Sequence, residues 1–150
     1  MSYRFTQVTI RTNNSFQGLK KIEELWIDVS AGQIPMLFDD SGNPLKDIFP
    51  VARYSNYESG EEGAYDLSIL AVGSDFFQDM QSQVESGKYK RYDACDQDIT
   101  LCVKLAWKKV WEDDENGNLR RSYSADYEQI IPPKYSQDGK AHCFLYIAVD

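Results

Sequence analysis

Histidine and cysteine are scarce in this 150-residue chain, and their scarcity argues against several kinds of site. His142 is the only histidine, and the three cysteines, Cys95, Cys102 and Cys143, are odd in number and form no Cys-x-x-Cys spacing. A disulfide framework and a zinc site are therefore not expected, and reduced thiols fit a cytoplasmic protein. A Ser/His/Asp triad would depend on His142 alone, whose surroundings "AHCFLYIAV" are typical of a buried strand.

Long apolar segments are also missing. No run approaches the roughly 20 residues that a membrane-spanning helix requires, and the opening "MSYRFTQVTI" lacks the apolar core of a signal peptide. No P-loop, dinucleotide fingerprint, nucleophile elbow or metal-ligand spacing occurs. The sequence therefore predicts a cytoplasmic protein that contacts no membrane, holds no cofactor and binds no metal.

Positive charge is the third deficit. Lysine and arginine total 16, against 24 aspartates and glutamates, and the formal net charge is −8. Such a surface repels phosphate backbones, so direct binding of nucleic acid is not expected. It attracts cationic partners, modestly at physiological salt.

Aromatic residues, by contrast, are plentiful. They make up 13% of the chain, with ten tyrosines, within a hydrophobic fraction of 42%. This is enough apolar material for the core of a single domain of this length. Tyrosine has an apolar ring and a polar tip, so it suits the wall of a binding pocket as well as a core.

Hydrophobic periodicity predicts two helices and six strands. The helices are expected at 17–31 and 98–114, the second with Asp96 or Asp98 as its N-cap and Gly117 in its C-terminal turn. Their apolar stripes comprise Ile22, Leu25, Trp26 and Val29 in the first, and Val103, Trp107, Val110 and Trp111 in the second. The strands are expected at 3–12, 51–58, 64–73, 88–95, 119–131 and 141–149. Residues 32–50 have loop chemistry, and 74–87 are ambiguous, with a helical turn around Phe76–Met80 as one interpretation.

The order of these elements suggests an internal repeat of a β-α-β-β module. Helix residues match at a shift of 85, "NYE" (56–58) matches "DYE" (126–128) at a shift of 70, and "ILAV" (69–72) matches "YIAV" (146–149) at a shift of 77. We therefore predict an α+β fold of two halves, about 1–75 and 83–150, related by a pseudo-two-fold axis. An antiparallel sheet would pack against two main helices, with a groove between the halves and Glu58 as the counterpart of Glu128.

Three segments of the chain resemble the gyrase-inhibitor-like effector-binding domain of AraC-type and multidrug-responsive bacterial regulators. They are "YSNYESGEEGAYDL", "AWKKVWEDDENGNLRRSYSADYEQI" and the closing "AHCFLYIAV". The resemblance covers nearly the whole chain and implies a stand-alone domain without a DNA-binding domain. It also implies a groove that binds small cationic or aromatic molecules, faced by an acidic residue of the penultimate strand. The matching residue here is Glu128.

Glu128 also has a physical rationale of its own. A carboxylate among aromatic rings loses hydration, which raises its pKa and makes an empty site costly, and a cationic ligand offsets that cost. The alternatives are a salt bridge to Arg120 or Arg121, or a solvated strand end. The predicted ligand-binding residues are Glu128, Tyr127, Tyr123, Trp107, Trp111, Tyr57, Glu58 and Tyr65. For Glu58 a solvated position at the hairpin mouth is an equal alternative, and the tryptophans are core candidates as well.

Three functions follow from these features. The first is the binding of small cationic or aromatic compounds. The second is hydrolysis of reactive cyclopropane-bearing DNA alkylators, an activity of some enzymes with the fold that the resemblance implies, with Glu128 as general base. An enzyme is the less favoured interpretation, and no other catalytic residue is assigned. The third is a protein-interaction role like that of the gyrase inhibitors, and a homodimer also stays open.

Overall fold

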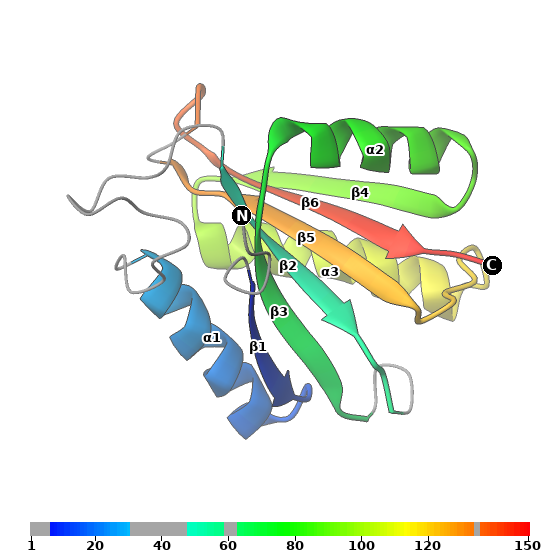
Figure 1. Cartoon of the computed structure of the whole chain (residues 1–150), viewed down its shortest axis with the longest axis horizontal. Helices are drawn as coiled ribbons and strands as arrows, with labels where there is room; N and C mark the ends of the chain where they lie inside the picture. The colour runs from blue at the N-terminus through cyan, green and yellow to red at the C-terminus, as the bar shows by residue number, and fades with distance from the viewer. Residues whose placement is uncertain (1–6, 31–47, 59–62, 134–135) are drawn as a thin grey trace. The chain divides into compact units, whose positions relative to one another are not determined.

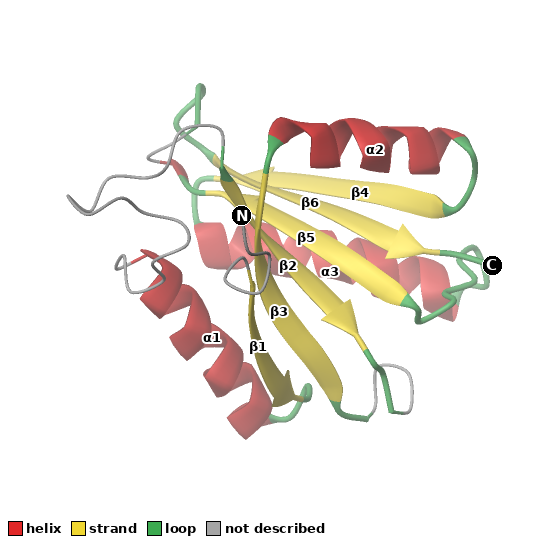
Figure 2. Ribbon diagram, in the orientation of Figure 1, coloured by secondary structure: helices red, strands yellow, loops and turns green. Residues whose placement is uncertain are grey.

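The computed structural model describes residues 7–30, 48–58, 63–133 and 136–150. These residues form three helices and six strands (Figures 1 and 2). In chain order they are β1 (Gln7–Thr12), α1 (Phe16–Ser30), β2 (Phe49–Ser55), β3 (Tyr65–Val72), α2 (Ser74–Glu85), β4 (Tyr89–Asp96), α3 (Ile99–Glu115), β5 (Ala125–Ile131) and β6 (Ala141–Ala148). The class is α+β, with antiparallel sheet packed against helices, as predicted.

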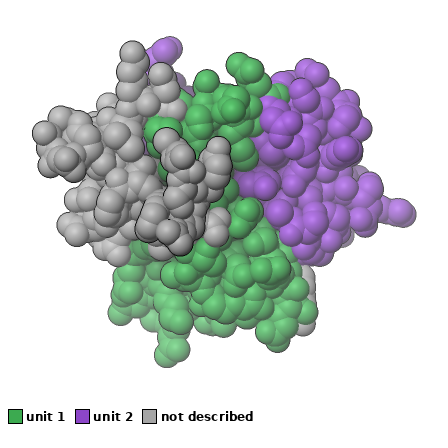
Figure 3. All heavy atoms as spheres, viewed as in Figure 1, with its two compact units in different colours: residues 1–78 green, residues 79–150 purple. Residues whose placement is uncertain are grey.

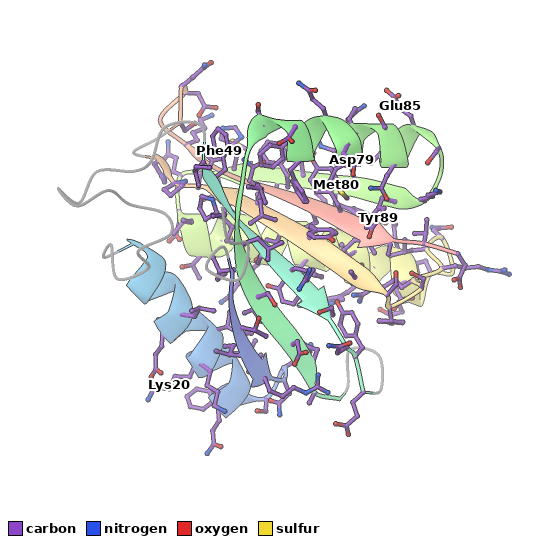
Figure 4. The ribbon with its side chains drawn as sticks, viewed as in Figure 1. Lys20, Phe49, Asp79, Met80, Glu85 and Tyr89 are labelled. Carbon is purple, nitrogen blue, oxygen red and sulfur yellow. The ribbon has the colours of Figure 1, made fainter. Side chains whose placement is uncertain are left out.

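The chain divides into two compact units, residues 1–78 and 79–150 (Figure 3). The boundary falls between the two predicted halves and inside α2. In the part of α2 that belongs to unit 2, Met80 is buried, whereas Glu85 is exposed (Figure 4). No described helix combines the length and the apolar character needed to cross a membrane.

In unit 1, β3 is the central strand and pairs with β1 on one side and β2 on the other, both antiparallel. Leu67 and Ile69 of β3 are fully buried. Helix α1 is joined to β1 by the Thr12 hydroxyl, which donates to the carbonyl of Gly18 at 2.8 Å. Glycine is required at position 18 because a Cβ would overlap the carbonyl oxygen of Asn13.

In unit 2, β6 is central and pairs with β4 and β5, again antiparallel. Helix α3 packs on β4 and β6. Its Cys102, Ala106 and Val110 form one buried cluster with strand residues that include Leu145 and Ile147. We call the sheet face that carries these two residues the helix side of unit 2. The opposite face is called the far side.

The ends of α3 follow the predicted chemistry. The Asp98 carboxylate caps the helix by accepting from the backbone N–H groups of Thr100 and Leu101, at 2.8 and 3.3 Å. Gly117 follows the last turn with a φ of 75°, a conformation that glycine adopts without steric cost. The apolar stripe is rotated from the prediction, because Cys102 and Ala106 lie at its centre and Trp111 is 46% exposed.

The β-α-β-β repeat is present in both units. In each, the last strand pairs with the first and the second, so that β1-β3-β2 corresponds to β4-β6-β5. Adding 76 to the residue numbers carries β2 (49–55) onto β5 (125–131) and β3 (65–72) onto β6 (141–148), and it carries the pair Val51↔Leu70 onto Tyr127↔Tyr146. Strand ends and register thus repeat together.

This register corrects two of the sequence matches. The shift of 77 between "ILAV" and "YIAV" is wrong by one residue, and a one-residue slip reverses the face of every side chain in a strand. The shift of 70 that paired Glu58 with Glu128 is also wrong. The structural counterpart of Glu128 is Ala52, which is fully buried, and Glu58 lies beyond the end of β2. The repeat therefore supplies one carboxylate at this strand position, not two.

Other element predictions differ at specific points. The ambiguous segment 74–87 is mostly helix α2. The strand predicted at 119–131 begins only at Ala125, because Tyr123 adopts a left-handed φ of 56° and interrupts the extended chain. Residues 32–47, most of the predicted loop, lie outside the described residues, as do the side chains of Trp26 and Val29.

Candidate functional site

Glu128 is a buried carboxylate on the helix side of unit 2. It lies in β5 directly opposite Leu145, so its side chain leaves the face that α3 covers. It is 1% exposed, and its Oε2 accepts a hydrogen bond of 2.6 Å from the indole Nε1 of Trp107. Sheet and helix thus hold the carboxylate in one position.

A second tryptophan connects this pair to the surface. Trp107 and Trp111 are four residues apart on α3, on neighbouring turns of the same helix face. Their rings are stacked, with centroids 6.2 Å apart and planes inclined by 29°. Trp107 is half-buried and Trp111 is 46% exposed. Aromatic surface therefore runs from solvent to the ring that hydrogen-bonds the buried carboxylate.

Tyr127 does not join this group. Side chains alternate along a strand, so Tyr127 leaves the far side of β5 while its neighbour Glu128 leaves the helix side. Its ring contacts Tyr89 of β4, with centroids 6.1 Å apart. The Tyr89 hydroxyl donates to the Ala125 carbonyl at 3.0 Å. The sequence did not single out Tyr89 (labelled in Figure 4), because only the β4–β6–β5 pairing brings it near Tyr127.

The environment of Tyr89 gives a prediction for alkaline pH. Burial, together with the nearby Tyr127 and Asp126, raises the pKa of Tyr89 to about 12. In the unfolded chain the Tyr89 hydroxyl has the ordinary tyrosine pKa of about 10. The contribution of Tyr89 to stability is thus complete below pH of about 10 and is lost as pH rises toward the folded-state pKa. Tyr89→Phe is expected to flatten the fall in the free energy of unfolding over this interval, measured by urea denaturation. An unchanged slope would contradict the assignment.

Tyr123 lies in the connection before β5. Its ring stacks against the guanidinium of Arg121, with the Cζ 4.5 Å from the ring centroid. The same guanidinium forms a buried salt bridge with Asp126, in which Nη2 and Oδ2 are 2.8 Å apart. Sequence inspection did not identify this ion pair, because the two residues are separated by the turn at Tyr123.

The predicted residues of unit 1 form a tyrosine cluster with an exposed acid beside it. Tyr65 is buried and contacts both Tyr54 and Tyr57, with ring centroids 5.6 and 5.7 Å apart. The Glu58 side chain is 67% exposed and lies 4.0 Å from the Arg11 guanidinium. Of the two alternatives for Glu58, the structure shows the solvated one.

A separate hollow of about 200 Å³ lies in unit 1 near the start of α1. Its lining is polar and includes Arg11, Asn13, Ser15 and Lys21. None of the residues predicted to bind ligand belongs to it.

Comparisons with known proteins support the fold but not a family. No protein-family model matches the chain, and no curated protein matches it. An integron cassette protein from the mobile metagenome of Vibrio cholerae, known from a crystal structure, is similar with a TM-score of 0.62 and 23% sequence identity. The similarity covers 97% of this chain and 88% of that one. At this identity it establishes a shared fold and leaves function to the residues of the site.

Proposed function

We propose that the chain is a cytoplasmic binding protein for small cationic aromatic compounds, with Glu128 and Trp107 at the centre of its site. The observation that carries this proposal is the buried Glu128 carboxylate, held by an indole N–H on the face that α3 covers. Burial of a charge costs free energy unless a counter-charge or hydrogen bonds offset it. A cationic ligand would add an ionic contact to a carboxylate that the Trp107 indole already holds in position.

The tryptophans favour a flat ligand. A cation over an aromatic ring gains about 0.5–2 kcal/mol, depending on how far it is desolvated. The stacked rings of Trp107 and Trp111 offer such surface next to the carboxylate and up to the solvent. A site of this kind selects charge and planarity more than detailed shape, which agrees with the broad ligand range implied by the resemblance to effector-binding domains.

Unit 1 and the remaining aromatic residues have different parts in the proposal. Tyr57 and Tyr65 lie in the tyrosine cluster of unit 1, and the proposed site is restricted to residues of unit 2. Tyr127 leaves the far side of β5 and is therefore less suited to touch a ligand that reaches Glu128. Tyr123 lies beside Arg121 in the connection before β5, and the proposal assigns it no ligand contact. The proposal assigns no role to Glu58.

A matched ligand pair tests the proposal. N-methylacridinium is a permanent cation, and acridine is nearly the same shape and neutral at neutral pH. We expect N-methylacridinium at about 100 times its Kd to raise the free energy of unfolding by about 2.7 kcal/mol, with a corresponding rise in Tm. Acridine should give a much smaller shift. Equal rises in Tm for the two compounds would overturn the proposal. It would also be overturned if neither compound, nor any of a wider set of planar cations, raised the Tm. Slow hydrolysis of a bound reactive compound would instead favour the hydrolase.

A further inference from the structure

A thiol, an imidazole and a carboxylate meet in unit 2, away from Glu128. Cys95 of β4 lies directly opposite His142 of β6, so both side chains leave the same face. Asp138, in the turn before β6, places both carboxylate oxygens 2.9 Å from His142 Nε2. The Cys95 Sγ lies 3.9 Å from that nitrogen. One donor atom from each residue lies within 4.8 Å of the others.

Strand register separates this cluster from the proposed ligand site. His142 and Leu145 are three residues apart in β6, so their side chains leave opposite faces. Leu145 lies opposite Glu128 on the helix side, and the cluster is consequently on the far side. An inference about the cluster is therefore independent of the proposed function.

The geometry differs from that of a nucleophilic triad. In a triad the imidazole uses two nitrogens, one toward the nucleophile and the other toward the carboxylate. Here the Cys95 thiol and the Asp138 carboxylate both approach Nε2 of His142. A thiol and a carboxylate that converge on one imidazole nitrogen surround a common point, which is the arrangement that a metal ion requires.

Neighbouring groups hold the carboxylate and the ring. The Ser136 hydroxyl donates to Asp138 Oδ1 at 2.6 Å, and the Lys140 backbone N–H donates to the same atom at 3.0 Å. These bonds and the nearby His142 keep the pKa of Asp138 far below its usual range, so the carboxylate is ionised at neutral pH. The His142 ring stacks on Phe144, with planes inclined by 7°. Such outer contacts orient ligands in metal sites.

We propose that Cys95, Asp138 and His142 bind a zinc ion, with a water molecule in the fourth position. Zinc accepts sulfur, nitrogen and oxygen donors together at about 2.0–2.3 Å, and a tetrahedral set of such bonds places the donors roughly 3.3–3.8 Å apart. The observed separations are close enough that small side-chain rotations reach this geometry. Magnesium and calcium prefer oxygen donors and do not suit a thiolate and an imidazole. Partial exposure of the three residues leaves access for the ion and the water.

The sequence did not predict this site, because its ligands come from β4, from a turn and from β6. Cys95 and His142 are 47 residues apart, and no short spacing marks them. A bound ion would join the end of β4 to the turn that precedes β6. It would therefore stabilise this edge of unit 2 without acting on the ligand site.

The test is titration of the full chain, purified with chelator and then freed of it, with Zn²⁺ alone by isothermal calorimetry. We expect one ion per chain, and Co²⁺ in the same site should show thiolate-to-metal charge-transfer absorption. Cys95→Ser should abolish that absorption. Cys95→Ser, Asp138→Asn and His142→Ala should each weaken Zn²⁺ binding by more than the roughly 10–100-fold that loss of an outer-shell partner causes.

Asp93→Asn is the matched control. Asp93 is an exposed carboxylate two residues before Cys95 on the same face of β4, and it pairs with Arg91. Its replacement removes the same charge and should leave Zn²⁺ affinity unchanged within about twofold, as expected for a screened surface charge. Circular dichroism of each variant establishes that it folds. The proposal would be overturned if stoichiometric Zn²⁺ binding survived Cys95→Ser. It would also be overturned if no binding occurred at a Zn²⁺ concentration about 100 times a micromolar Kd, and a simple His142–Asp138 ion pair would then remain.

Discussion

Glu128→Gln is expected to abolish most of the stabilisation that N-methylacridinium gives the protein. Glutamine has nearly the same shape and keeps a carbonyl oxygen that can accept from the Trp107 indole, so the hydrogen bond of 2.6 Å has a substitute. What is lost is the negative charge. Removing one partner of a buried charge pair costs about 2–5 kcal/mol of binding. The rise in Tm that near-saturating N-methylacridinium gives the variant should therefore fall nearly to the rise that neutral acridine gives the parent chain.

The unliganded variant is expected to fold at least as well as the parent chain. A buried neutral amide costs less to desolvate than a buried carboxylate. Stability without ligand and response to ligand should thus change in opposite directions, which a purely structural role for Glu128 would not produce. Urea denaturation with and without N-methylacridinium separates the two effects.

Glu58→Gln is the control for this experiment. It makes the same chemical change at an exposed position in the other unit, where the side chain is 67% exposed. The ligand-induced shift should persist in this variant. If Glu58→Gln removed the shift and Glu128→Gln kept it, the assignment of the site to the helix side of unit 2 would be wrong.

Asp126→Ala is expected to cause the largest loss of stability among the substitutions considered. Asp126 is fully buried, with one oxygen 2.8 Å from Arg121 Nη2 and the other accepting from the Ala148 backbone N–H at 2.8 Å. Truncation leaves a buried guanidinium and a buried amide without this acceptor. The expected loss is about 3–5 kcal/mol, a large share of the roughly 5–15 kcal/mol of a typical domain.

Two further variants identify the cause. Glu112→Ala removes an exposed partner of Lys108 on α3, a pair whose side chains are 57–68% exposed, and should cost about 0.3–0.5 kcal/mol. The double variant Arg121→Met with Asp126→Leu replaces the buried pair by apolar side chains and should recover much of the loss. A loss below about 1 kcal/mol for Asp126→Ala, measured by urea denaturation, would show that the pair is not a buried determinant of stability.

Local chemistry accounts for the features that were correctly predicted. The helix at 98–114 was identified from its apolar spacing and from Asp98, and both act within a few residues of the chain. The two β-α-β-β modules followed from the order of such elements. The sequence of α2 is ambiguous, because the segment is short, has few apolar residues and buries only Met80.

The position of Glu128 shows where this local reasoning ends. The tyrosines around "NYE" and "DYE" made Glu58 and Glu128 look equivalent. The repeated strand register makes Ala52, not Glu58, the counterpart of Glu128, and Glu58 is exposed to solvent. Sequence similarity over three residues does not determine the register in which two strands pair. That register decides which face of the sheet every side chain occupies.

The sequence by itself determined the α+β class, the repeated modules, the acidic surface and the supply of aromatic rings and carboxylates, since composition and periodicity are properties of consecutive residues. Tertiary structure alone decided which of them meet. It set Glu128 against Trp107, turned Tyr127 to the other face, paired Arg121 with Asp126 and brought Cys95 to His142. Each of these contacts depends on strand register and helix placement, which are set by burial of the whole core and not by neighbours along the chain.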